Sequence, residues 1–215
     1  AMGSLGAMVL ANGTADKLAA HCGATHKALL DIAGQPMVMR VLQAVQASPL
    51  VSEVVVTCLQ DGPVAQALRG QAPLGEAADG TFFAGIQAGF AALSGAERVL
   101  LVTCDMPLLT EAAVTDFGRQ VLQAPEADLV YAMVEISRVR EAYPNTQRTA
   151  VRLREGQYTA AGLSAISARF HSDTASSVRR VSSVRMESPF SAFSRRSARS
   201  RVNSFSQVPS SALAP

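Results

Sequence analysis

The chain has 215 residues, of which 48% are hydrophobic and 17% charged, so it is long enough to bury one sizeable core. Its net charge of +2 is uneven: the residues after Phe170 hold seven arginines and two acidic residues, which leaves −3 for the rest and gives no reason to expect a nucleic-acid-binding body. No apolar run reaches the roughly 18 residues of a membrane span, and the three cysteines lack disulfide or zinc-ligand spacing, so we expect a cytoplasmic protein without a membrane partner.

The first predicted element is a short strand over residues 7–11, an apolar run that ends at Asn12-Gly13. This pair accepts a positive φ and therefore indicates a turn into a loop. The loop that follows is long and polar, and connections of this kind in a compact domain are usually functional or mobile. His21 and His26 within it lack the spacing of metal ligands, so we expect both to be solvated loop residues.

The next elements alternate between helix and strand. Pro36 suits a first helical turn, and apolar residues recur after it with helical spacing as far as Val45. We then predict a buried strand at 54–56, a short helix from Gly62-Pro63 to Leu68, a loop of small residues at 75–80, and an amphipathic helix whose inner side carries Phe82, Phe83, Ile86, Phe90 and Leu93.

A central strand is predicted at 99–102, because four apolar residues in a row indicate burial on both faces of a parallel sheet. Asp105 follows this strand, and Thr110 suits the N-cap of a helix over 111–123. A further strand is expected at 128–134. The alternation of strand and helix predicts an α/β fold with a doubly wound, mainly parallel sheet.

The pattern changes in the last third of the chain. Residues 150–159, with Arg154-Glu155-Gly156 at their centre, predict a β-hairpin beside the main sheet. From Ser172 onward serine and arginine dominate without a helical or alternating period, and such a composition cannot bury enough surface to fold alone. We therefore predict an α/β domain over residues 1–170 and a Ser/Arg-rich tail, disordered or atypical, over 171–215.

Asp105 and the first loop are the candidates for chemistry. In open α/β sheets ligands bind at the carboxyl ends of the strands, where both would lie. Gly13 permits backbone N–H groups to approach a triphosphate, and Lys17 and Lys27 can place positive charge on the phosphates. Asp105 could hold Mg2+, which is commonly bound through one or two carboxylates plus substrate phosphates. The combination indicates phosphoryl or nucleotidyl transfer, and the alternative is that Asp105 only caps a turn.

Two other phosphate-binding motifs are absent from the sequence. It has no G-x-x-x-x-G-K-[ST] P-loop, and no G-x-G-x-x-G follows the first strand. A Walker-type NTPase and a dinucleotide-dependent oxidoreductase therefore lose support.

Four stretches carry a resemblance to a known family. Met8–Gly13, Lys27–Leu30 and Gly34–Met37 match, in order, a strand with a Leu-Ala-Gly-Gly turn, a loop with Lys, and a Gly-x-Pro sequence. Leu101–Leu108 looks like a strand followed by Gly-Asp-x-Pro. In these features the chain resembles the MobA-like nucleotidyltransferases over about residues 7–135.

The resemblance implies a GT-A-like Rossmann three-layer sandwich that binds an NTP, GTP or CTP, at the first loop. The phosphate of a small-molecule acceptor would attack the α-phosphorus and pyrophosphate would leave, with Mg2+ held by Asp105. By the same match Lys27 and Asp105 are the catalytic residues, and the nucleotide-binding residues are Leu10, Ala11, Asn12, Gly13, Lys17, Lys27, Gly80 and Thr81. Relatives include molybdenum cofactor guanylyl- and cytidylyltransferases, which makes molybdenum cofactor biosynthesis an expected role.

The chain departs from the family pattern at several places. Asn12 stands where the first Gly of a pair is expected, and Thr81 stands where members of a subgroup often have Asn. Ala160–Leu163 replaces a Gly-Gly-Asn-Leu type of sequence after the hairpin. The second metal-binding carboxylate or Asn that the family supplies late in the chain has no clear counterpart. These departures keep open a catalytically impaired nucleotide-binding relative with a structural or regulatory role.

Two further alternatives have less support. A glycosyltransferase of the same architecture usually has two acidic residues around one metal, as in Asp-x-Asp, where this chain has Asp105 alone. The Ser/Arg tail could bind RNA or acidic membranes, but no aromatic platform is interleaved with its arginines, so nucleic acid is not an expected partner.

Overall fold

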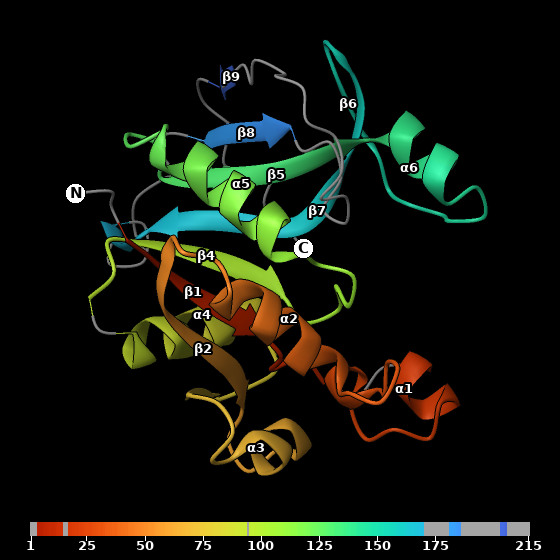
Figure 1. The fold of residues 1–215 in the computed structure, drawn as a ribbon, viewed down its shortest axis with the longest axis vertical. Helices are drawn as coiled ribbons and strands as arrows, with labels where there is room; N and C mark the ends of the chain where they lie inside the picture. Colours follow the sequence, from red (N-terminus) through yellow and green to blue (C-terminus); the bar gives the residue numbers. More distant parts are fainter. Residues whose placement is uncertain (1–3, 15–16, 94, 170–180, 186–202, 206–215) are drawn as a thin grey trace.

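A computed structural model of the chain describes residues 4–14, 17–93, 95–169, 181–185 and 203–205. These residues form a nine-stranded sheet in the order β3-β2-β1-β4-β7-β5-β8-β9, with β6 paired to β7 (Figure 1). The strands are β1 Leu5–Leu10, β2 Val51–Leu59, β3 Leu74–Ala77, β4 Arg98–Thr103, β5 Leu129–Glu135, β6 Val151–Leu153, β7 Gly156–Ser167, β8 Val181–Arg185 and β9 Asn203–Phe205.

Helices connect most of these strands. They are α1 Lys17–His21, the 3-10 helix η1 Lys27–Leu29, α2 Met37–Gln46, α3 Pro63–Leu68, α4 Phe82–Ala92, α5 Glu111–Leu122 and α6 Ile136–Ala142. Strands β3, β2, β1 and β4 are parallel, so the carboxyl ends of β1 and β4 meet at one edge of the sheet. The prediction of a mixed α/β fold with a mainly parallel sheet is confirmed.

The core lies on both faces of the sheet because its central strands are apolar on both sides. On one face Ala7 and Val9 pack with residues of α2, α3 and α5. On the other face Met8 and Leu101 pack with Ile86 of α4 and its neighbours. The molecule therefore has three layers, with α4 covering the face opposite to α2, α3 and α5 (Figure 1).

The segment predicted as a loop of small residues, 75–80, is partly strand. Leu74–Ala77 forms β3 and pairs in parallel with β2. Gly75 is needed here for packing, since a Cβ at this position would lie 2.8 Å from the carbonyl oxygen of Ala88 in α4. The small residues thus allow a helix to approach the strand, which is a reason for their presence that local turn signals do not reveal.

The hairpin is confirmed, but its expected place beside the sheet was wrong. β6 and β7 pair in antiparallel register, with Leu153 opposite Gly156. The longer arm, β7, then continues between β4 and β5 and pairs with both. β7 is buried along most of its length, which fits a central strand.

Two aromatic residues of α4 lie elsewhere than predicted. Phe82 and Phe83 are 54% and 72% exposed, although both were expected on the inner side of the helix. Ile86 and Leu93 are buried as expected, and Phe90 is half-buried. The two exposed rings occupy the first turn of α4, and the buried residues of this helix begin after them at Ala84.

The region predicted as a Ser/Arg-rich tail contributes two described segments to the sheet. β8 pairs in parallel with β5, and β9 pairs in antiparallel with β8. The remaining residues from 170 onward, His171 among them, lie outside the described part of the chain, and the domain boundary at residue 170 stays a prediction. Within the described residues no helix has the length and apolar character to cross a membrane.

We expect Gly75→Ala to lower the free energy of unfolding by about 1–3 kcal/mol, because the new methyl group would press on the backbone of α4, which cannot rotate away. Gly13→Ala is the matched control. A Cβ at Gly13 would meet no heavy atom within 4 Å, so its effect should stay below about 0.5 kcal/mol. Urea denaturation of both variants measures this, and equal stabilities would contradict the packing argument.

Candidate active site

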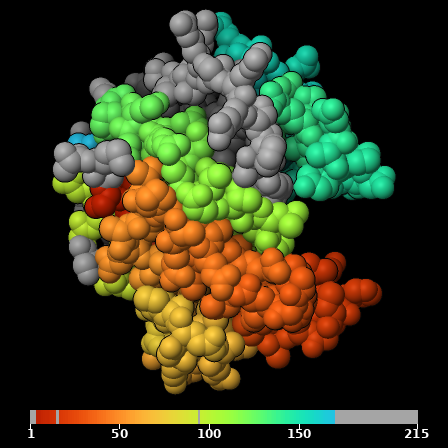
Figure 2. All heavy atoms as spheres, viewed as in Figure 1, coloured from red at the N-terminus to blue at the C-terminus, as the bar shows by residue number. Residues whose placement is uncertain are grey.

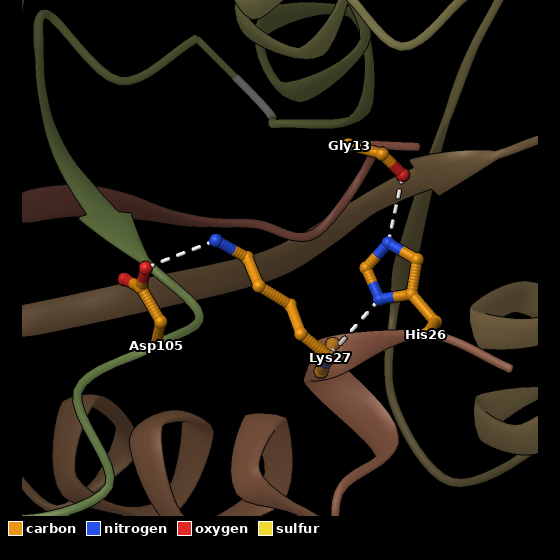
Figure 3. A network of polar contacts seen from close by, with 5 residues as sticks. Gly13, His26, Lys27 and Asp105 are labelled. Carbon is orange, nitrogen blue, oxygen red and sulfur yellow. Dashed lines mark hydrogen bonds and ion pairs between the residues drawn. The ribbon is translucent and has the colours of Figure 1, made fainter. Parts of the chain in front are cut away.

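The two residues expected to carry the chemistry lie in contact at the carboxyl edge of the sheet. Asp105 follows β4 by two residues, and Lys27 is the first residue of η1. Lys27 Nζ lies 3.0 Å from Asp105 Oδ2 and forms an ion pair with it (Figure 3). The two side chains are 32% and 46% exposed, so a solute can reach both of them.

The surroundings of Asp105 keep its carboxyl group ionised. Burial by itself would raise the pKa of Asp105, but hydrogen bonds from Thr103 and Lys27, together with the positive charge of Lys27, lower that pKa below its ordinary value. An ionised carboxylate only accepts hydrogen bonds and attracts cations. Asp105 is therefore chemically suited to hold a divalent cation.

His26 is buried, and the expectation that it would be a solvated loop residue was wrong. Its side chain is 4% exposed, whereas His21 in α1 is exposed as expected. His26 Nδ1 accepts a hydrogen bond from the backbone N–H of Ala28 at 3.0 Å and so caps η1. His26 Nε2 lies 2.7 Å from the carbonyl oxygen of Gly13, which ties η1 to the end of β1 (Figure 3).

Asn12 is a second buried polar residue at this edge. Its Nδ2 donates hydrogen bonds to the carbonyl oxygens of Asp79, at 3.2 Å, and Thr81, at 2.7 Å. A Cβ at Gly85 would overlap the Asn12 amide, so the glycine makes room for it. The strand does run into a loop here as predicted, and neither Asn12 nor Gly13 has a positive φ. The side-chain amide of Asn12, and no special backbone conformation, joins the first loop to the start of α4.

The segment before α4 is ordered by its own polar groups. The backbone N–H of Thr81 donates to Asp79 Oδ1 at 2.8 Å, and Thr81 Oγ1 accepts from the N–H of Ala84 at 3.2 Å as the N-cap of α4. A Cβ at Gly80 would lie 2.8 Å from Thr14 Cγ2, so this segment touches the first loop directly. The predicted residues Asn12, Gly80 and Thr81 therefore lie together, where the first loop contacts the segment before α4.

The remaining predicted residues occupy different surroundings. Leu10 ends β1, and Ala11 is buried with its N–H donating to the carbonyl oxygen of Thr57 at 2.8 Å. Lys17 begins α1, is exposed, and takes no part in the contacts described above. In the space-filling view the outline is indented between the α1 region and residues 136–150, with the residues after β4 at the bottom of the indentation (Figure 2).

The donor groups around Asp105 fit a metal that is shared with a substrate better than one caged by protein. Among the described residues no group of three or more His, Cys, Asp and Glu side chains could hold a metal ion. Gly162, in the Ala160–Leu163 sequence, has φ +75°, and a Cβ there would lie 2.6 Å from Met106 Sδ and 2.9 Å from Thr103 Oγ1. β7 thus packs against the residues around Asp105 with a glycine. One ionised carboxylate fits Mg2+, which often keeps its waters and takes further ligands from phosphates.

Comparison with known proteins gives a family match and several similar structures. The profile of the MobA-like NTP transferase domain family matches residues 7–139. A structure described as a hypothetical transferase from Thermus thermophilus is 35% identical with a TM-score of 0.61, and the match covers 76% of this chain and 65% of that one. This chain therefore spans just under two thirds of the length of that protein. No curated protein matches the chain.

Two more distant structures share the fold. CMP:2-keto-3-deoxy-manno-octonic acid synthetase complexed with CTP is 14% identical with a TM-score of 0.60, over 81% of this chain and 77% of that one. 4-Diphosphocytidyl-2C-methyl-D-erythritol synthase from Anaerococcus prevotii is 12% identical with a TM-score of 0.53, over 78% of this chain and 71% of that one.

Removal of the Asn12 amide should loosen the junction between the first loop and α4. We expect Asn12→Ala to lower the free energy of unfolding by about 1–3 kcal/mol, because two carbonyl oxygens lose their donor. Asn12→Asp should lose at least as much, since a carboxylate of the same shape cannot donate to them. Asn145→Ala, at an exposed residue, is the control. Thermal and urea denaturation measure these effects, and an Asn12→Ala protein as stable as the control would refute this role.

The lowered pKa of Asp105 makes stability depend on pH in the acid range. Above the ordinary aspartate value of about 3.9 the carboxylate contributes fully, and this contribution is lost as pH falls through the lower pKa of the folded state. Between about pH 5 and pH 3 the free energy of unfolding of the wild type should therefore fall more steeply than that of Asp105→Asn. Urea denaturation at several pH values tests this, and parallel curves would show that Asp105 has no lowered pKa.

Proposed function

The chain belongs to the MobA-like NTP transferase domain family, and on this basis we propose that it moves a nucleoside monophosphate from an NTP to a phosphorylated small molecule, with Mg2+ and with release of pyrophosphate. The observation that carries the proposal is the contact of Lys27 with Asp105 at the edge of the sheet where β1 and β4 end. This contact places a cationic group and an anionic group beside the first loop. A metal-bound triphosphate needs a positive charge for its phosphates and a carboxylate for its metal.

The proposed reaction needs positioning and charge neutralisation more than covalent chemistry. An oxygen of the acceptor phosphate attacks the α-phosphorus and forms a new P–O bond. The bond from the α-phosphorus to the oxygen that bridges to the β-phosphorus breaks, and pyrophosphate leaves with that oxygen and the bonding electron pair. Lys27 would stabilise the negative charge that develops on the leaving group. Mg2+, held by Asp105 and the phosphates, would supply further neutralisation when bound.

The Lys27–Asp105 ion pair has a consequence for how the binding of a nucleotide affects the binding of Mg2+. While the two side chains neutralise each other, Asp105 offers little net charge to a cation, and Lys27 offers little to a phosphate. A nucleotide that binds together with its cation can give each side chain a new partner of opposite charge. The phosphate oxygens would then contact the Lys27 ammonium group, and the cation would contact the Asp105 carboxylate. We therefore expect nucleotide and Mg2+ to strengthen each other's binding.

The proposed nucleotide is GTP or CTP, with the base and ribose along Leu10, Ala11, Asn12 and Gly13 and the segment with Gly80 and Thr81. The Asn12 hydrogen bonds support this placement, because they hold the two loops together on one side of the site. One structural neighbour is a synthetase complexed with CTP, which is in line with a pyrimidine nucleotide. Molybdenum cofactor biosynthesis and a cytoplasmic location stay what the sequence predicts.

A second candidate function is nucleotide binding without turnover. Gly162 favours it, because β7 reaches the Asp105 region at a residue that has no side chain to ligate a metal. With one protein carboxylate instead of two ligands, the cation would be held less firmly in the transition state. A protein of this kind would act as a structural or regulatory relative of the transferases.

We expect the wild type to bind GTP or CTP in calorimetry only when Mg2+ is present. Lys27→Ala and Asp105→Ala should each weaken this binding at least tenfold, about 1.4 kcal/mol. The first substitution removes the positive charge that would face the phosphates, and the second removes the negative charge that would face Mg2+. Asp116→Ala removes an exposed carboxylate on α5 and is the matched control. Unchanged affinity in both site variants would end the proposal.

Pyrophosphate release separates the two candidate functions. The wild type is incubated with each NTP, Mg2+ and a panel of phosphorylated sugars, alcohols and pterins. Release that depends on the acceptor and is lost in Asp105→Ala supports the transferase. Magnesium-dependent binding without release from any pair of substrates supports the second function.

A further inference from the structure

We propose that His26 is a positioning residue of the nucleotide site, which holds Lys27 and the carbonyl group of Gly13 in a fixed relation through its two ring nitrogens. The inference rests on the proposed function, because its purpose is to place Lys27 against the phosphates of the NTP. His26 itself would touch neither the nucleotide nor the cation, since both of its ring nitrogens already have protein partners.

The hydrogen bonds define the state of the ring. The backbone N–H of Ala28 can only donate, so Nδ1 of His26 must carry a lone pair. In a neutral imidazole the proton is then on Nε2, which donates to the carbonyl oxygen of Gly13 at 2.7 Å. The side chain is 4% exposed, so water competes little for either contact. The ring is therefore a fixed bridge between the end of β1 and η1.

The hydrogen bond between His26 and Gly13 holds together the two ends of the first loop. Residues 14–25 lie between Gly13 and His26, and ordering the ends of such a loop carries an entropic cost of several RT. The His26 contact holds these ends together, and its Nδ1 contact orients the first residues of η1. Lys27 is the next residue, and its side chain extends away from the ring to Asp105 (Figure 3). A shift of His26 would therefore move the backbone from which Lys27 reaches the site.

Histidine suits this task for a geometric reason. The imidazole ring has no rotatable bond between its acceptor nitrogen and its donor nitrogen. The position of Ala28 therefore fixes the position of Gly13 relative to it, and the reverse also holds. Asparagine is a good N-cap and could accept from Ala28, but its shorter side chain cannot also span to Gly13. His26→Asn therefore separates the capping of η1 from the bridge to the first loop.

We expect His26→Asn to keep the fold and to bind a magnesium nucleotide at least tenfold more weakly than the wild type. Far-UV circular dichroism and thermal denaturation report the fold, and calorimetry with GTP or CTP and Mg2+ reports the affinity. His21→Asn is the matched control, because the same substitution falls on an exposed histidine of α1. A folded His26→Asn protein with wild-type affinity would overturn the inference.

Nitrogen NMR of the protein without nucleotide tests the bridge independently. The wild type should show His26 protonated at Nε2 and unprotonated at Nδ1. The backbone amide signals of Gly13 and Lys27 should shift in His26→Asn and stay in place in His21→Asn. If the wild type binds no NTP, the proposed function fails, and these signals still decide whether His26 positions the two residues. Unmoved signals, or a ring protonated at Nδ1, would refute the positioning role.

Discussion

The ion pair between Lys27 and Asp105 is the contact on which the chemistry proposed for this edge of the sheet depends. The two residues are far apart in sequence and meet because β1 and β4 are parallel neighbours whose carboxyl ends coincide. A charged pair in this half-exposed position contributes little to stability by itself. It places one positive and one negative group at the same point of the sheet edge, where the proposed magnesium nucleotide would bind.

Two buried polar side chains hold the backbone around that pair. Asn12 links the first loop to the start of α4, and His26 links the same loop to η1. An unpaired polar group is costly in such surroundings, so each of these contacts strongly favours one arrangement of the loops. The first loop is thus held from both sides by two side chains: Asn12 departs from the expected sequence pattern, and His26 was not part of it.

The family match over residues 7–139 includes both residues of the proposed site. These residues are Lys27 and Asp105, which form an ion pair at the edge where β1 and β4 end. Gly162 differs from the expected pattern for a packing reason, because a larger residue would collide with Met106 and Thr103. Gly162 thus allows close contact between β7 and the residues at the end of β4.

The sequence alone determined the elements whose signal is local. Continuous apolar runs identified β1, β2 and β4, and helical spacing identified α2. The motifs that contain Lys27 and Asp105, together with the family resemblance, predicted that these two residues meet. The neighbours of each element in space depend on the tertiary structure, and the local sequence signals did not predict them. Gly75 has the sequence signal of a loop residue, but α4 packs on it in the fold. β7 lies in the centre of the sheet, and His26 is buried with its ring hydrogen-bonded to the carbonyl oxygen of Gly13. Periodicity shows which faces of a segment are apolar, but it carries no information on which distant residue will cover them.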